Sequence, residues 1–583
     1  MNAGTRRAFI NSGIAAALSP FYTAGVAGQT AARVRPHLHN LRRKAVSISW
    51  IALEAAAGSV DAGAAGMATR TSVKAKRKLV TAGVYRYQAD LEDLEPGQPY
   101  AYCVRHNGAA IPGCEALAFR TPASRGTGSR IVALGDSGTD SPAQRQLAAM
   151  MIARQPEVML HTGDLVYPSG TLESYLERFF APYAPLLERI PVFPCPGNHD
   201  YYHEQANFYV ALHALPSAGV PDEGQGRYYS FDWDNAHFVV LDSNTPLEDA
   251  AAGRGPMLEW LEKDLAASRQ FWKIAMFHHP PFAGGPNQGD PLSALARQHI
   301  VPILERHGVQ LVLNGHEHNY QRSHAINGIV YLTTGGGGAD LYEPLPRAEA
   351  AFQQGSYHFL ETELKPTELT TRAIRIDGAT IDSLTLKPEP RAQRLVNPAS
   401  QTAAIAPGGL AAIHGRHLAP REGDLESVRV FVRHQPAQVV FAAPDQVTFI
   451  VPPDLVGDAE IRIETANGQA GLAVLIHESA PAIFLLEKDG RAFPSLFHAD
   501  GAPVTKTNPA RLGEELALYF TGAGAATAGS VESGDFAQEA RIEPAPDQPG
   551  VHRLFFRPDV GTGATFCLRI GTNTSNAAAW SVR

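Results

Sequence analysis

The sequence lacks several features that would place it in a special class of protein. Its 583 residues include only 4 cysteines, which are too few for a disulfide scaffold and lack the paired C-x-x-C spacing of a zinc site. No segment reaches the roughly 18 consecutive apolar residues of a membrane helix. The formal net charge of −8 excludes the basic excess typical of proteins that bind nucleic acid or anionic lipid. We therefore expect no transmembrane anchor and no nucleic-acid partner.

The composition that remains is that of an ordinary globular protein. Hydrophobic residues make up 44% and charged residues 19% of the chain, which argues against a disordered, collagen-like or coiled-coil protein. At about 150 residues per domain, the length suggests three or four domains. The 53 glycines and 43 prolines follow no period, as expected where many short strands are joined by turns.

The first residues resemble an export signal. Arg6 and Arg7 precede an apolar segment from Ile14 and small residues up to Ala27, in the order found in twin-arginine signal peptides. An exposed N-terminal tail is the plainer alternative. We expect residues 1–27 to be a twin-arginine-type signal peptide, and the protein to be exported to the periplasm or the extracellular space.

The cysteines have structural rather than chemical roles in this interpretation. Cys103 and Cys114 flank a turn-like segment, so a disulfide across a hairpin is plausible outside the cytoplasm and would stabilise the fold by about 3 kcal/mol. Two buried thiols are the alternative. Cys195 and Cys567 are most simply small core residues.

Residues 28–122 alternate strand-like runs with Gly, Asn and Pro turns, which predicts a β-sandwich. The segment Leu91–Tyr100, LEDLEPGQPY, resembles a turn of fibronectin type III-like modules. Residues 394–479 and 480–583 form two further β units, in which Gly408 and Pro453 recur at one common offset as Gly513 and Pro558. These two units look like the Ig-like modules of secreted bacterial proteins. We expect them either to contact a cell surface or glycan or to act as a spacer from a surface.

Residues 130–386 have a different pattern, in which short apolar strands alternate with amphipathic helices, and they predict an α/β catalytic domain with its loops at the strand ends. The expected strands are Ile131–Leu134, Val158–Leu160, Val192–Pro194, Phe238–Leu241, Lys273–Phe277, Gln310–Leu313 and Val330–Leu332. The expected helices are Pro142–Arg154, Glu173–Arg189, Pro256–Arg269 and Leu292–His307.

Five of the strand-to-loop junctions carry metal-ligand side chains. Any one of them would be ordinary turn chemistry, but five in order are hard to produce by chance. Carboxylate, imidazole and carbonyl groups converging from adjacent strand ends suit a two-metal hydrolase, in which two ions share a carboxylate and a hydroxide. Glycine before a ligand permits a sharp turn beside the metal. The junctions are Gly135-Asp136-Ser137-Gly138, Gly163-Asp164-Leu165-Val166-Tyr167, Gly197-Asn198-His199-Asp200, His278-His279-Pro280 and Gly315-His316-Glu317-His318.

These five motifs resemble the metallophosphoesterase superfamily, of calcineurin-like type, and specifically the purple acid phosphatases, because Tyr167 completes the form G-D-x-x-Y. The resemblance implies that Asp136, Tyr167 and His318 hold Fe(III), and that Asp164 bridges both metals. It implies that a divalent ion (Zn, Fe or Mn) is held by Asn198, His278 and His316. Charge supports a trivalent ion, because two aspartates, a tyrosinate and a hydroxide would leave no positive charge for phosphate beside two divalent ions.

The expected reaction is attack on phosphorus by the metal-bound hydroxide, with His199 stabilising charge and protonating the leaving alcohol. His279 and Arg322 are candidate substrate-binding residues, although a structural role suits each as well. The segment Phe282–Asp290 contains no histidine, so the second substrate-contacting group of plant-type relatives has no counterpart there.

The sequence therefore predicts an exported acid phosphatase that hydrolyses small-molecule phosphate monoesters. A phosphodiesterase or nucleotidase on the same metal centre is the nearest alternative, because both reactions use this chemistry. A secreted binding or adhesion protein with a vestigial catalytic domain is the second.

Overall fold

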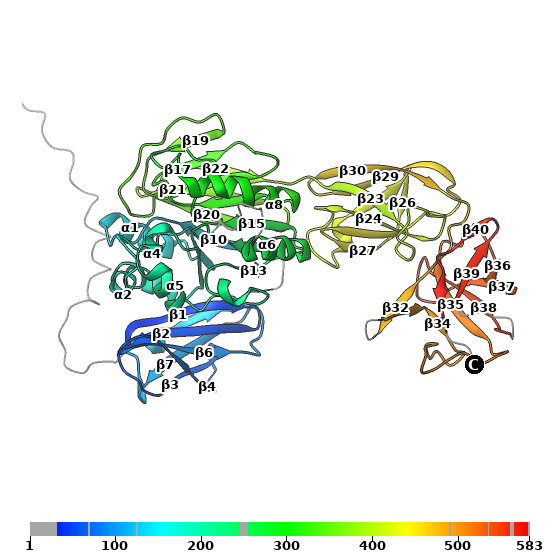
Figure 1. Ribbon diagram of the computed structural model, residues 1–583, viewed down its shortest axis with the longest axis horizontal. Helices are drawn as coiled ribbons and strands as arrows, with labels where there is room; N and C mark the ends of the chain where they lie inside the picture. The colour runs from blue at the N-terminus through cyan, green and yellow to red at the C-terminus, as the bar shows by residue number, and fades with distance from the viewer. Residues whose placement is uncertain are drawn as a thin grey trace, which may run out of the picture.

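The computed structural model describes residues 32–580 except 68–69, 124–125, 245–254, 489–490, 535 and 560–564, so the predicted signal peptide lies outside the described residues. The chain is multidomain and mostly β-sheet. Figure 1 shows the N-terminal strands in blue packed against the unit that contains the helices, with two β units in yellow and red following on one side. None of the described helices has the length and apolarity to span a membrane.

The N-terminal unit consists of two antiparallel sheets, consistent with the predicted β-sandwich; its fibronectin type III-like character remains a prediction. Trp50 and Tyr87 are fully buried and stack with ring centroids 5.2 Å apart. One sheet has the order β1 (Ala32–Arg42), β2 (Ala45–Ala52), β6 (Val84–Leu91) and β5 (Lys76–Thr81). The other has the order β4 (Thr71–Lys74), β3 (Gly58–Ala64), β7 (Pro99–His106) and β8 (Ala109–Ala110), with β9 (Ala118–Arg120) paired to β7.

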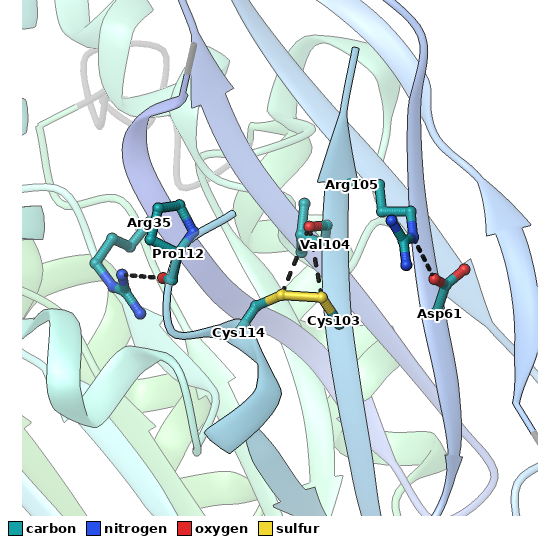
Figure 2. The surroundings of a disulfide bond; sticks show 7 residues. All are labelled: Arg35, Asp61, Cys103, Val104, Arg105, Pro112 and Cys114. Carbon is teal, nitrogen blue, oxygen red and sulfur yellow. Dashed lines mark hydrogen bonds and ion pairs between the residues drawn. A yellow bond between two sulfur atoms is a disulfide. The ribbon is translucent and has the colours of Figure 1, made fainter. Parts of the chain in front are cut away.

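A disulfide joins Cys103 of β7 to Cys114 of the short helix η1 (Cys114–Ala116), with the two Cα atoms 4.8 Å apart (Figure 2). Arg35 of β1 donates to the carbonyl of Pro112 in the same turn, at 3.0 Å. Cys195 is buried and unpaired, as a core residue would be. The turn is therefore fixed both to its own sheet and to the neighbouring one.

The central unit has two mixed sheets, each of which contains a run of neighbouring parallel strands. The first has the order β12 (Val192–Pro194), β11 (Val158–His161), β10 (Ser129–Leu134), β20 (His358–Leu364), β21 (Leu369–Arg375) and β22 (Thr380–Leu386). The second has the order β13 (Tyr229–Trp233), β14 (Ala236–Val240), β15 (Trp272–Met276), β16 (Leu311–Asn314), β18 (Val330–Thr334), β17 (Tyr320–Ser323) and β19 (Ala350–Gln354).

Successive side chains of β10 point to opposite faces of the first sheet and enter two different hydrophobic cores. Ile131 and Ala133 of β10 belong to a core shared with the second sheet, whereas Val132 and Leu134 pack with α1. The N-terminal unit shares the first of these cores. The helical segments are α1 (Pro142–Ala153), α2 (Leu172–Ser174), the π-helical η2 (Tyr175–Phe180), α3 (Ala181–Leu187), α4 (Asn198–Tyr201), η3 (Glu204–Ala206), α5 (Asn207–Leu212), η4 (Asp222–Gly224), α6 (Pro256–Ala267), α7 (Pro291–Leu295), η6 (Ala296–Ile300) and α8 (Val301–Arg306).

The two C-terminal β units each have a core of their own. The first has two four-stranded sheets formed by β23 (Arg391–Val396), β24 (Leu410–Arg416), β25 (Arg429–Val432), β26 (Gln435–Ala437), β27 (Val439–Ala443), β28 (Gln446–Ile450), β29 (Gly457–Thr465) and β30 (Gly468–Ile476), with the short helix η7 (Leu425–Ser427). The second contains β31 (Ala482–Ile483), β32 (Leu485–Lys488), β33 (Arg491–Pro494), β34 (Leu496–Phe497), β35 (Leu516–Thr521), β36 (Ala528–Ser533), β37 (Phe536–Pro544), β38 (His552–Phe556), β39 (Thr565–Ile570), β40 (Asn573–Thr574) and β41 (Ala578–Ala579). Their Ig-like character remains a prediction.

Candidate metal centre

Five loops meet where the parallel strands end. Strands β10, β11 and β12 are parallel neighbours in the first sheet, and β15 and β16 are parallel neighbours in the second. Each of these five strands is followed by one of the sequence motifs. Since the carboxyl ends of parallel strands lie on one edge, the fold gathers residues that are far apart in the sequence.

A first group of ligand atoms surrounds the Tyr167 hydroxyl. Its oxygen lies 2.9 Å from Asp164 Oδ2, 3.2 Å from Asp136 Oδ1 and 3.0 Å from His318 Nε2. His318 Nε2 is also 3.5 Å from Asp136 Oδ1. Asp136, Asp164 and His318 are buried. These are the residues predicted for the first ion, together with the predicted bridging carboxylate.

A second group surrounds the Asn198 side-chain carbonyl. Asn198 Oδ1 lies 3.0 Å from His278 Nε2 and 3.1 Å from His316 Nδ1. His278 Nε2 is in turn 3.5 Å from Asp164 Oδ2, the same oxygen that contacts Tyr167. Asp164 therefore lies between the two groups, at the position that a bridging ligand requires.

An oxygen atom lies close to the outer nitrogen of each of the three ligand histidines. His278 Nδ1 contacts the carbonyl of Thr162 at 2.9 Å, and His318 Nδ1 contacts that of Asp340 at 2.7 Å. His316 Nε2 lies 2.9 Å from Asp290 Oδ2. Because these partners only accept, the outer nitrogens carry the protons and the inner nitrogens present lone pairs.

The inner atoms of the second group are therefore acceptors that face one another. Asn198 donates its amide nitrogen to the Tyr202 hydroxyl at 2.8 Å, which leaves Oδ1 directed inward. When the rings are neutral, the lone pairs of two histidines and a carbonyl oxygen repel at about 3 Å unless a cation or a proton lies between them. The donor set of this protein fits a metal ion here.

The charges of the site also call for positive charge between the ligand atoms, as a metal ion or as a proton. Burial raises the pKa of Asp136 well above its ordinary value. Burial also acts to raise the pKa of Asp164, but His278 outweighs it and the pKa is lowered. The pKa of His278 is raised to about 9, because Asp164 and Asp136 outweigh the effect of burial. Burial and both aspartates raise the pKa of Tyr167 well above 10. A tyrosinate here requires a strongly charged cation.

The local backbone explains the glycines that precede the ligands. A Cβ on Gly315 would lie 2.5 Å from Asp136 Oδ2, and one on Gly163 would lie 2.5 Å from His278 Nδ1. Asp136, Asp164 and His316 themselves adopt left-handed conformations, with φ of 57°, 52° and 71°. Such conformations cost energy in non-glycine residues and occur preferentially at functional sites.

His199 lies at the open side of the site. Its backbone N–H donates to Asp164 Oδ1 at 2.8 Å, and its ring Nδ1 contacts the carbonyl of Pro168 at 2.7 Å. Nε2 is 4.0 Å from Asp164 Oδ2, and the side chain is 27% exposed. The ring therefore presents Nε2 beside the shared carboxylate, within reach of solvent.

His279 and Arg322, expected as substrate-binding residues, have other partners. His279 is fully buried, and its Nδ1 lies 2.7 Å from Ser243 Oγ. Arg322 forms a two-point ion pair with Asp382, at 2.6 and 3.1 Å. These contacts favour the structural role for both residues.

Two aspartates in the site were not among the predicted residues. Asp200 accepts hydrogen bonds from the backbone N–H groups of Gly197 and Leu165 and from the Tyr175 hydroxyl, so it ties the second loop to the third. Its position directly after His199, within the third motif, was the feature of the sequence that could have identified Asp200 as part of the site. Asp290 contacts His316, and nothing in the segment around it distinguishes this carboxylate from a turn residue.

Comparisons with known proteins agree with this geometry. Residues 129–320 match the family model of calcineurin-like phosphoesterases. Acid phosphatase type 7 of Homo sapiens is 24% identical and is aligned over 41% of this chain and 57% of its own length. Purple acid phosphatase 23 of Arabidopsis thaliana is 26% identical, over 42% of this chain and 61% of its own.

A protein of Arabidopsis thaliana called probable inactive purple acid phosphatase 1 is 26% identical, over 53% of this chain and 58% of its own length. The chain thus spans about three fifths of these curated relatives. A solved purple acid phosphatase from yellow lupin seeds shares the fold with a TM-score of 0.54, at 19% identity, over 60% of this chain and 74% of its own. Residues 129–320 are therefore a calcineurin-like metallophosphoesterase domain, in a chain whose relatives include purple acid phosphatases.

Proposed function

We propose that this protein is an exported phosphatase that hydrolyses small-molecule phosphate monoesters at a binuclear metal centre of the purple acid phosphatase type. Asp136, Tyr167 and His318 would hold Fe(III), Asp164 would bridge, and Asn198, His278 and His316 would hold a divalent ion such as Zn, Fe or Mn. The observation that carries the proposal is the sharing of Asp164 Oδ2 by two groups of inward-facing acceptor atoms.

A bound metal pair would offset the charge of the phosphoryl oxygens and lower the pKa of a coordinated water. The trivalent identity of the first ion is inferred from Tyr167. Because burial and two carboxylates raise the pKa of this hydroxyl, its ionisation calls for a strong Lewis acid.

His199 would donate the proton to the leaving alcohol. Its Nδ1–H is directed to the Pro168 carbonyl, so the ring has a fixed orientation and Nε2 is free to hold the transferred proton. The partial exposure of the side chain leaves room for an ester group beside it. The backbone hydrogen bond to Asp164 would hold His199 close to the shared carboxylate.

A complete donor set supports activity, although two of the relatives are named as probable inactive enzymes. All seven predicted ligand positions carry a side chain able to bind metal, and each inner atom lies within 3.5 Å of another. A vestigial domain in a binding protein would have no need to keep acceptor atoms in repulsive contact.

The proposal is tested by steady-state hydrolysis of an aryl phosphate monoester and the matching diester by the metal-loaded protein between acidic and alkaline pH. Monoester preference with an acidic optimum supports it. Diester preference would keep the ligand assignment and favour the phosphodiesterase alternative. Turnover of neither compound would overturn the proposal and favour the binding protein.

A further inference from the structure

We propose that Asp290 is a positioning residue for the second metal position, where it holds His316 so that Nδ1 faces the ion. This inference rests on the proposed metal centre. Asp290 lies outside the five motifs, in the loop that connects β15 to α7.

The carboxylate of Asp290 is fixed at both oxygens. Oδ2 lies 2.9 Å from His316 Nε2, and Oδ1 accepts the backbone N–H of Leu292 at 2.7 Å as the N-cap of α7. The side chain is only 19% exposed. His279 Nε2 is 4.0 Å from the same Oδ2, too far for a hydrogen bond. The short contact is therefore to the ligand histidine.

This contact determines which nitrogen of His316 can bind metal. A carboxylate accepts, so Nε2 must carry the ring proton and Nδ1 is left with a lone pair. Nδ1 is the atom that lies 3.1 Å from Asn198 Oδ1 in the second group. A carboxylate on the outer nitrogen also raises the basicity of the inner one, which strengthens metal binding.

The loop that carries Asp290 is anchored on the motif it serves. Asn287 donates its backbone N–H to Glu317 Oε1 at 2.9 Å and its side-chain amide to the His316 carbonyl at 3.1 Å. Gly284 exchanges two hydrogen bonds with the Gln321 side chain, at 2.9 and 2.7 Å. These four bonds join residues 284–287 to residues 316–321, so the distance between Asp290 and His316 is set by the fold.

The test compares Asp290→Asn with Asp290→Ser. Asparagine has the same size and can cap α7, but its amide would either oppose the N–H of His316 or give up the cap. Serine keeps a capping hydroxyl and is too short to hold His316. Asp222→Asn, which removes a carboxylate from an exposed turn, controls for the loss of charge.

The measurements are metal content after dialysis and the dissociation constants of the two ions from titration with Zn²⁺ into metal-free protein. We expect both Asp290 variants to lose about 10- to 100-fold in affinity for one ion only, with the other ion and the Asp222→Asn protein unchanged. Because serine preserves the cap, Asp290→Ser decides the question if Asp290→Asn does not fold.

Two tight ions in both Asp290 variants would overturn the inference, as would equal weakening of both sites. A wild-type protein that binds two ions but hydrolyses no phosphate ester would overturn the proposed function and leave the role of Asp290 standing. If the wild-type protein hydrolyses phosphate esters and both Asp290 variants bind two ions normally, the proposed function would stand and the role of Asp290 would be refuted. Fewer than two ions in the wild type would refute both.

Discussion

The backbone N–H of His199 donates a 2.8 Å hydrogen bond to Oδ1 of Asp164, whose other oxygen lies between the two groups of ligand atoms. One carboxylate thus fixes the proposed proton donor and the bridging position together. The backbone makes this contact, so the imidazole can be changed without removing it. The chemistry and the metal binding of the site can therefore be tested separately.

Replacing His199 by alanine is expected to reduce kcat for an aryl phosphate monoester by about 10²- to 10⁴-fold, the usual contribution of a general acid. Metal content should stay at the wild-type value, because the His199 N–H to Asp164 remains. His203→Ala is the matched control, since this histidine is nearby, is partly exposed and stacks on Phe208. Loss of metal from His199→Ala would instead make the ring structural.

Replacing Tyr167 by phenylalanine removes only the hydroxyl that joins Asp136, Asp164 and His318. If iron is bound, the wild-type protein should show a visible absorption band from tyrosinate, and Tyr167→Phe should lack it. The metal-free protein should also lack it, because the visible band arises from charge transfer between the tyrosinate and iron. Visible spectra of the three samples check this, and a band that persists in the variant would refute the assignment.

Many of the strands and the ligand motifs of the catalytic domain could be predicted, because each is encoded by a short, contiguous pattern in the sequence. Apolar runs predicted β10 and β15 within two residues, and a glycine before Asp164 and His316 marked the turns that the backbone requires. The strands β20 and β21, which extend the first sheet, were not predicted, because β20 joins the sheet by a long-range antiparallel pairing with β10 and β21 then pairs with β20. Asp290 was not predictable for a related reason: its importance comes from a contact across the fold.

Three buried histidines make acid stability a further test. His37 and His39 of β1 lie beside His213, which follows α5, and Arg86 donates to the His213 carbonyl. Burial lowers the pKa of His37 to about 3, that of His213 to about 4 and that of His39 well below 6.5. Since the unfolded chain protonates these rings near pH 6.5, stability falls as the pH drops from there toward 4.

Each such histidine should contribute about 1.4 kcal/mol of lost stability per pH unit in this window. The free energy of unfolding from urea titrations between pH 7 and 4 measures the slope. His39→Phe should reduce this slope by the contribution of one histidine. His434→Gln, in an exposed connection between strands, should leave the slope unchanged. An equal slope in wild type and His39→Phe would contradict a neutral, buried His39.

Removing residues 390–583 is expected to leave kcat and KM unchanged. The first C-terminal unit contacts the catalytic domain at several points, among them the ion pair of Arg269 with Asp445 and the hydrogen bond of Gln310 with His417. The described partners of the ligand side chains lie within the catalytic domain itself. Steady-state kinetics of residues 1–389 against the full chain test this expectation. Collapse of activity in a folded truncated protein would show that these units complete the substrate pocket.

The metal content of wild-type protein and of Asp164→Asn tests the central claim most directly. Elemental analysis after dialysis should find close to two ions per wild-type chain and substantial loss of both in the variant, because the two sites share this carboxylate. Asp140→Asn, in the first loop but paired with Arg145, should retain both ions. Fewer than two ions in the wild type, or two tightly held ions in Asp164→Asn, would contradict a binuclear centre bridged by Asp164.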